Sequence, residues 1–122
     1  MGVMQVAQHA DDLDRARAFY EMLLGQPPAA SFEPPGLLFF TDGAIRLLLE
    51  RGAPSATVYF GVDNLAAEVE RLRDAGVTIV SEPHPIFHHD DATLGPAGTD
   101  EWHAFIRDSE GNLVGLVEHR HP

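Results

Sequence analysis

Hydrophobic and polar residues alternate in two stretches of the chain, and each stretch continues into a segment with helical periodicity. The first stretch is Gln5 to Gly25, and the second is Thr57 to Gly76. Alternation with a period of two predicts a half-buried strand, and apolar positions three and four residues apart predict a helix with one apolar stripe. Aligned without a gap, Asp12 meets Asn64 at the start of each predicted helix. The sequence therefore indicates a duplicated strand and helix.

Both predicted helices carry end signals. Asp12 and Asn64 have side-chain oxygens that can accept the free N–H groups of a first helical turn. Gly25 and Gly76 stand at the other ends, where glycine commonly closes a helix. These signals set the expected bounds of the two helices.

Three predicted strands follow each helix, separated by turn residues such as Asp42-Gly43. The predicted strands are residues 29–33, 37–41 and 44–50 in the first half, and residues 77–81, 101–108 and 113–118 in the second. Residues 88–100 are expected to form a long polar loop, and residues 119–122 a frayed end. The chain is therefore predicted to be an α+β protein with one domain, residues 1–122, made of two βαβββ modules, residues 1–52 and 53–122.

The amino-acid composition excludes several classes of function for this protein. Asp and Glu number 19 against eight basic residues, which gives a formal charge of −11 and disfavours nucleic acid as a partner. The chain has no lysine and no cysteine, which excludes Schiff-base chemistry, disulfides and thiolate metal sites. No signal peptide or membrane span is predicted, so we expect a cytoplasmic protein that does not bind membranes.

Two further motifs suggest a family. With the duplicated unit, Ala18-Phe19-Tyr20 and the segment from Arg107 to Leu113 make the chain resemble the vicinal oxygen chelate superfamily. That superfamily includes glyoxalase I, extradiol dioxygenases, fosfomycin-resistance enzymes, methylmalonyl-CoA epimerase and bleomycin-resistance proteins. The resemblance covers nearly the whole chain. It implies that the mixed sheets of the two modules curl into an open cup, which is usually completed in a homodimer.

The resemblance also implies a metal site, because enzymes of the superfamily hold a divalent ion in the cup with one side chain from each of four strands. These positions fall on Gln5, Arg46, Thr57 and Gly115. Only Gln5 suits a metal, since Arg46 is a cation, Thr57 is a weak neutral ligand and Gly115 has no side chain. We therefore expect neither a metal nor another cofactor.

Strand alternation predicts part of the wall of the cup if these four positions face inward, and we expect Trp102 and His103 to belong to the wall as well. The predicted ligand-binding residues are Gln5, His9, Arg46, Glu50, Thr57, Tyr59, Trp102 and His103. Arg46 requires a partner there, either a ligand anion or Glu50. Tyr59 either stacks on a ligand ring or fills the core, and both alternatives stay open.

Two classes of function fit these residues. The first is a metal-independent binding protein, a homodimer that sequesters a small, cationic aromatic molecule as bleomycin-resistance proteins do. The alternative is a lyase, isomerase or dioxygenase with atypical metal ligands, or a metal-free enzyme that uses His9, Glu50 or His103 as acid or base. A ligand-sensing subunit is a third possibility.

A relocated metal site is one version of the enzyme hypothesis. In the segment from His84 to His103, the adjacent His88 and His89 are followed directly by Asp90 and Asp91. Imidazole and carboxylate groups suit several divalent ions. Adjacent histidines on an extended chain point in opposite directions, however, so we favour a solvated loop.

Overall fold

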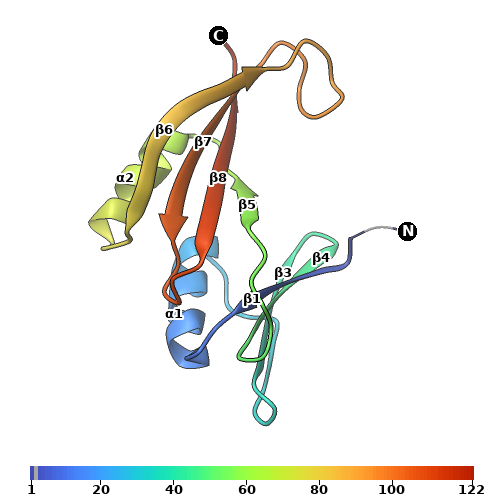
Figure 1. Ribbon diagram of the computed structural model, residues 1–122, viewed down its shortest axis with the longest axis vertical. Helices are drawn as coiled ribbons and strands as arrows, with labels where there is room; N and C mark the ends of the chain where they lie inside the picture. Colours follow the sequence, from blue (N-terminus) through green and yellow to red (C-terminus); the bar gives the residue numbers. More distant parts are fainter. Residues whose placement is uncertain (2) are drawn as a thin grey trace. The chain divides into compact units, whose positions relative to one another are not determined.

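The computed structural model describes residues 1 and 3–122 and divides the chain into two compact units. Unit 1 consists of residues 1–57 and 108–112, and unit 2 consists of residues 58–107 and 113–122. Each unit combines one helix with a four-stranded mixed sheet (Figure 1). This confirms the α+β class and the two predicted βαβββ modules. Neither helix in the described part of the chain has the length and apolar composition of a membrane span.

Unit 1 contains β1 (Gln5–His9), α1 (Leu13–Leu24), β2 (Ala30–Phe32), β3 (Leu37–Asp42) and β4 (Ile45–Glu50). The strand order is β1-β4-β3-β2, with β1 parallel to β4 and the other pairs antiparallel. Alternate residues of these strands, such as Leu38, Phe40 and Leu49, are fully buried together with Tyr20 of α1. Helix α1 therefore covers the apolar face of this sheet.

Unit 2 contains β5 (Val58–Gly61), α2 (Leu65–Asp74), β6 (Ile79–His88), β7 (Asp100–Arg107) and β8 (Leu113–Arg120). The order is β5-β8-β7-β6, with β5 parallel to β8. Helix α2 lies against β6, β7 and β8, and its apolar stripe is buried together with alternate strand residues such as Ile106 and Leu116. The other face of this sheet is not covered by α2, and we call it the open face.

The helix end signals act as the sequence predicted. Asp12 Oδ1 accepts a hydrogen bond from the Arg15 backbone N–H at 3.0 Å, and Asn64 Oδ1 accepts one from Ala67 at 3.1 Å. Gly25 ends α1 with φ of 70°, a left-handed conformation in which a side chain would be strained.

Two strands of unit 2 are longer than predicted. β6 continues through Pro83 and Pro85 to His88, because it is an edge strand with register shifts at which a missing N–H is tolerated. β8 continues to Arg120, because His119 and Arg120 pair with the start of β7. The predicted frayed end at residue 119 is therefore wrong.

The turn between β7 and β8, residues 108–112, belongs to unit 1. Asp108 is buried there, and its Oδ1 accepts the backbone N–H groups of Glu110 and Asn112 at 2.9 and 2.8 Å. Its Oδ2 accepts the Tyr20 hydroxyl and the Asn112 side-chain amide, both at 2.8 Å. Burial, and then the Asp108 carboxylate, raise the pKa of Tyr20 far above its ordinary value. The hydroxyl therefore remains a donor.

Glu110 of the same turn forms an ion pair within unit 1. Its side chain has no exposed surface, and Arg15 donates to it from Nε at 2.7 Å and from Nη2 at 3.0 Å. The Asp12 backbone N–H donates to it as well, at 3.0 Å. The hydrogen bond from Arg15 is the main reason that the pKa of Glu110 falls to about 2, although burial opposes the shift.

We expect Glu110→Gln to lower the free energy of unfolding by about 2 kcal/mol at pH 7, because it removes a charge-assisted pair. Since the pKa of Glu110 is depressed on folding, this contribution is complete above its ordinary pKa of 4.5 and is lost as the pH falls toward about 2. Urea unfolding of both proteins at pH 7 and pH 3 measures it. Glu21→Gln, which breaks the exposed Arg17 pair, is the control and should change little. A pH-independent difference at Glu110 would contradict this account.

Candidate functional site

The open face of the unit 2 sheet carries a continuous group of polar and aromatic side chains. Residues directly opposite one another in a sheet share a face, so the register of β7 with β8 and of β5 with β8 identifies its members. The residues of this face are Glu101, His103 and Phe105 of β7, Gly115, Val117 and His119 of β8, and Tyr59 and Gly61 of β5. All except the two glycines and Val117 have a polar or aromatic side chain.

Three of these side chains form an aromatic patch, defined as Tyr59, His103 and Phe105. The Tyr59 ring centroid lies 5.6 Å from that of His103 and 5.7 Å from that of Phe105, and the last contact is edge-to-face. The Tyr59 residue is 52% exposed. A Cβ on Gly115 would lie 2.4 Å from Cδ2 of Tyr59, so the ring lies over β8 only because position 115 is glycine. The patch can accept a further ring from solvent.

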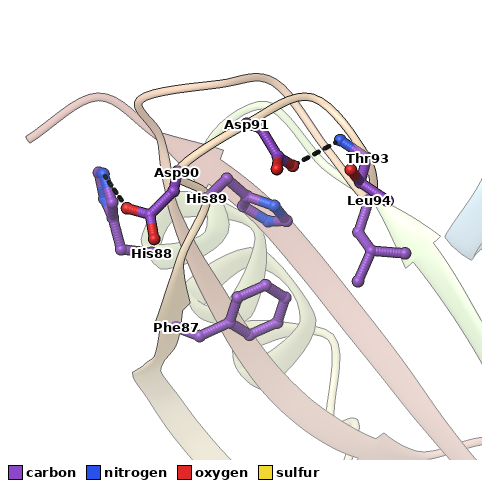
Figure 2. Close-up of a pocket in the computed structure, with 7 residues that line it drawn as sticks. All are labelled: Phe87, His88, His89, Asp90, Asp91, Thr93 and Leu94. Atoms are coloured by element: carbon purple, nitrogen blue, oxygen red, sulfur yellow. Dashed lines mark hydrogen bonds and ion pairs between the residues drawn. The ribbon is translucent and has the colours of Figure 1, made fainter.

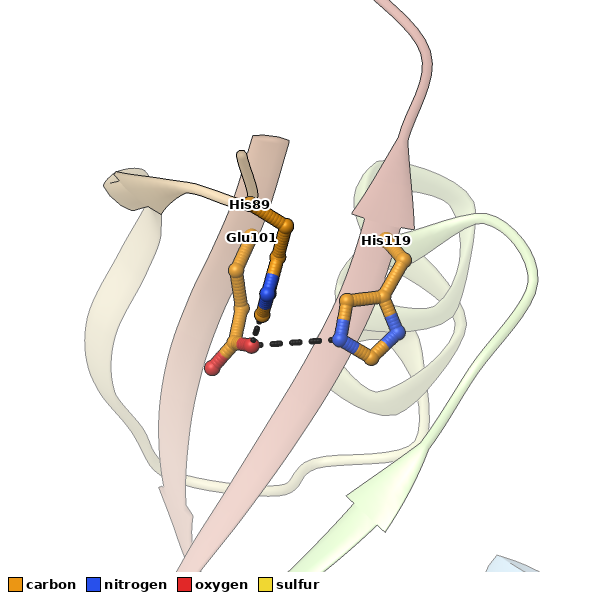
Figure 3. Close-up of side chains that lie close together, drawn as sticks. All are labelled: His89, Glu101 and His119. Carbon is orange, nitrogen blue, oxygen red and sulfur yellow. Dashed lines mark hydrogen bonds and ion pairs between the residues drawn. The ribbon is translucent and has the colours of Figure 1, made fainter. Parts of the chain in front are cut away.

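Glu101 is the centre of a second group, the histidine cluster, which also includes His89, His103 and His119. Its Oε1 lies 2.8 Å from Nε2 of His89 and 3.1 Å from Nε2 of His119. Figure 3 draws both contacts as dashed lines. Its Oε2 lies 2.5 Å from Nε2 of His103. One carboxylate thus binds three imidazoles.

The electrostatics of the cluster keep Glu101 ionised. Burial by itself would raise the pKa of Glu101, but hydrogen bonds from His103, His89 and His119 together hold it below its ordinary value. The ligating atoms of His89, Glu101 and His119 all lie within 4.8 Å of one another, a spacing that could hold a metal ion. The same carboxylate orients the His103 ring, an arrangement that suits acid–base chemistry.

A pocket of about 300 Å³ lies beside the histidine cluster and shares His89 with it (Figure 2). It is lined by Phe87, His88, His89, Asp90, Asp91, Thr93 and Leu94. The Phe87 ring lies 4.6 Å from the His89 ring, and Asp91 accepts a hydrogen bond from the Thr93 backbone. The volume is at the lower end of the range for small-molecule sites. The carboxylates of Asp90 and Asp91 make one side of the pocket acidic.

The predicted site residues of unit 1 form their own contacts. Arg46 donates to Gln5 Oε1 from Nε at 3.1 Å and from Nη2 at 2.7 Å, and its guanidinium carbon lies 5.4 Å from the centre of the Phe39 ring. The structure thus gives Arg46 the partner Gln5, which the sequence analysis did not consider. His9 pairs with Glu50 across β1 and β4, and its Nε2 lies 2.8 Å from Asp11.

The four positions that the resemblance assigns to a metal do not fit one. In unit 1, the side-chain oxygen of Gln5 is engaged by the guanidinium of Arg46, which is itself a cation. Thr57 is an exposed residue that precedes β5. In unit 2, Gly115 offers no donor and lies under the Tyr59 ring. A divalent ion requires several oxygen or nitrogen donors, and this set supplies too few.

In unit 2 the structure brings Tyr59 and His103 together but places Trp102 on the other face of the sheet, where Arg120 lies 3.9 Å above its ring. The sequence analysis missed Glu101 and His119. Glu101 could have been found from alternation, because it lies two residues before His103 on the same strand. His119 was hidden by the predicted frayed end.

One family model matches nearly the whole chain, and solved structures share its fold. The model described as Glyoxalase/Bleomycin resistance protein/Dioxygenase superfamily matches residues 2–116. No protein of curated function matches the chain. A lactoylglutathione lyase from Agrobacterium tumefaciens is 25% identical, with coverage of 96% of this chain and 92% of that one and a TM-score of 0.68. A glyoxalase-related enzyme from Fulvimarina pelagi is 17% identical, with coverage of 97% and 88% and a TM-score of 0.71.

Proposed function

Because the chain belongs to the Glyoxalase/Bleomycin resistance protein/Dioxygenase superfamily, we propose that it binds a small organic molecule, without a metal at the four superfamily positions. The ligand lies on the open face of unit 2. The aromatic patch carries this proposal, since Tyr59 presents a half-exposed ring that packs against Gly115 of β8. Aromatic rings of this kind stack on ligand rings and attract cations through their π faces.

A positive charge on the ligand is favoured by the charges of the protein. The chain has a formal charge of −11, and Asp90 and Asp91 line the adjacent pocket. A negative field concentrates cations near a binding site and repels anions. The proposed ligand is therefore a small cationic aromatic compound, which the protein sequesters without converting it.

Three probes of similar shape test the charge preference: benzyltrimethylammonium, benzyl alcohol and benzoate. Calorimetric titration should show saturable, one-to-one binding of the cation, weaker binding of the neutral compound and none of benzoate. Binding of benzoate alone would contradict the proposal.

We also propose that the protein is a cytoplasmic homodimer with two equivalent sites. Light scattering of the purified protein measures its mass and so tests the dimer.

We expect Tyr59→Ala to weaken binding of benzyltrimethylammonium about tenfold, because the ring supplies the stacking and cation–π contact. Tyr59→Phe keeps the ring and should bind within about twofold of the original protein, which makes it the matched control. Calorimetry on the three proteins measures the difference. Equal affinity of the alanine and phenylalanine variants would show that the ligand lies elsewhere.

A metal-free enzyme is the second candidate, and the contact between His103 and Glu101 favours it. The Glu101 carboxylate holds Nε2 of His103 at 2.5 Å beside the Tyr59 ring, which orients the imidazole and leaves Nδ1 to exchange protons with a substrate. The similar protein from Agrobacterium tumefaciens is described as a lyase. Product formation during the binding titrations would select this function over sequestration.

A further inference from the structure

Three strands or strand ends bring His89, Glu101 and His119 to one point of the open face. Glu101 and His119 are direct partners in the β7–β8 register, so their side chains share a face. His89 follows the end of β6, and its backbone is fixed by hydrogen bonds with Thr99 and Gly98 across the loop, both at 2.8 Å. Backbone hydrogen bonds therefore bring the three side chains together, in addition to the contacts among the side chains themselves.

Two of the distances among the three ligating groups are close to those around a metal ion. Metal bonds to imidazole nitrogen and carboxylate oxygen measure about 2.1 Å, which places neighbouring donors about 3.0 Å apart at right angles and about 3.4 Å apart in a tetrahedron. Glu101 Oε1 lies 2.8 Å from Nε2 of His89 and 3.1 Å from Nε2 of His119. Small outward shifts of these groups would admit an ion.

The remaining oxygen of Glu101 is already fixed by His103. Nε2 of His103 lies 2.5 Å from Oε2, so Oε1 alone faces the other two histidines. Ligating carboxylates are commonly held in this manner by an outer partner. His103 is thus a positioning residue. His88 bonds Asp100 through Nδ1 at 2.7 Å and is not one of the three converging groups.

Gly95 of the loop leaves the space beside these nitrogens free. A Cβ at Gly95 would lie 2.8 Å from Nε2 of His119 and 3.0 Å from Nε2 of His89. Any other residue would place a carbon atom against both ring nitrogens. The side chains of His89 and Glu101 are 2% and 13% exposed, whereas that of His119 is 33% exposed, so the site is open to solvent at His119.

We infer that His89, Glu101 and His119 form a binding site for one divalent first-row transition metal ion such as Zn²⁺ or Co²⁺. Two neutral imidazoles and one carboxylate suit these ions, whereas Mg²⁺ and Ca²⁺ require mainly oxygen ligands. The imidazoles bind through Nε2 and carry their protons on Nδ1. Three protein ligands leave at least one position open for water or another small ligand. None of the three residues occupies one of the four superfamily positions.

The test is a titration of untagged, chelator-treated protein with Co²⁺, followed by visible absorption, and with Zn²⁺ by calorimetry. We expect one ion per chain, with weak or no binding of Mg²⁺ and Ca²⁺. Glu101→Gln and His119→Ala should each lower Zn²⁺ affinity by about a hundredfold, and His103→Ala by about tenfold. Absence of saturable binding to the original protein would overturn the inference.

Two further variants separate the site from adventitious binding. Gly95→Ala keeps every ligand but places a methyl group against their nitrogens, so it should bind Zn²⁺ as poorly as the ligand variants. His121→Ala removes a histidine outside the cluster and should bind normally. Full affinity of His119→Ala, or loss in His121→Ala, would overturn the assignment. The titration contains no organic probe, so its failure would leave the proposed ligand site unaffected.

Discussion

Asp108→Ala is expected to lower the free energy of unfolding by about 3–5 kcal/mol, which corresponds to a fall in melting temperature of about 10–20 °C. The buried carboxylate accepts four hydrogen bonds, from Tyr20, from the Glu110 backbone and from the backbone and side chain of Asn112. Alanine removes the acceptor that these donors share in unit 1. The Asn112 side-chain amide keeps another acceptor, the His9 carbonyl at 2.8 Å. Each buried group left unpaired costs about 1–3 kcal/mol. Thermal and urea unfolding measure the change.

Tyr20→Phe provides a graded control for this prediction. It removes one of the four donors and leaves the carboxylate with the other three, so the expected loss is about 1 kcal/mol. A loss at Asp108→Ala no larger than at Tyr20→Phe would show that the turn is held by other contacts. In that case the side chain of Asp108 would matter little.

Gly115→Leu is expected to weaken binding of the cationic probe by at least about thirtyfold, or about 2 kcal/mol. Any Cβ at this position collides with the Tyr59 ring, so the longer leucine side chain must displace that ring from its edge-to-face contact with Phe105. The half-exposed ring can move outward into solvent, so the cost in stability should be only about 1–2 kcal/mol. Calorimetry and thermal unfolding measure the two effects separately.

Gly61 supplies the matched control, because it lies on the same face of β5 and a Cβ there meets no atom within 4 Å. Gly61→Ala should therefore leave both affinity and stability nearly unchanged. If Gly115→Leu bound the probe normally while remaining folded, the Tyr59 ring could not be the surface on which the ligand lies. The ligand would then have to bind to another surface of the protein.

The sequence predicted the fold well because local signals and global pairing agree there. The caps at Asp12 and Asn64 and the apolar stripes of both helices act within a few residues, so they can be read without tertiary information. The errors arose where long-range pairing prevails over local composition. β6 passes through Pro83 and Pro85 because it is an edge strand, and β8 reaches Arg120 because β7 pairs with it.

The candidate site was predicted only in part for the same reason. Tyr59 was identified from strand alternation, and His103 as a candidate at the rim of the cup. Their contact depends on the pairing register of β5, β7 and β8, which cannot be read from the sequence. Glu101 was overlooked although it lies two positions before His103, and His119 was assigned to a frayed end. The position of His89 depends on its backbone hydrogen bonds with Thr99 and Gly98 across the loop. The pattern of hydrophobic and polar residues does not predict these bonds.

The inferred metal site and the aromatic patch are neighbours, joined through one residue. His103 bonds Glu101 through Nε2, and its ring lies 5.6 Å from the Tyr59 ring. Loss of His103 should therefore affect both sites, whereas loss of His119 should affect only the metal and loss of Tyr59 only the organic ligand. These two variants separate the proposals.

The assignment of residues 108–112 to unit 1 has a consequence for how the chain is made. On the ribosome, residues 1–57 emerge long before the turn that supplies Asp108 to Tyr20 and Glu110 to Arg15. The nascent first half therefore lacks the acceptors for these groups until most of the chain has been translated. Contacts between residues so distant in sequence also slow folding, because a long loop must close before they form. The first module to be synthesised is thus completed only near the end of synthesis.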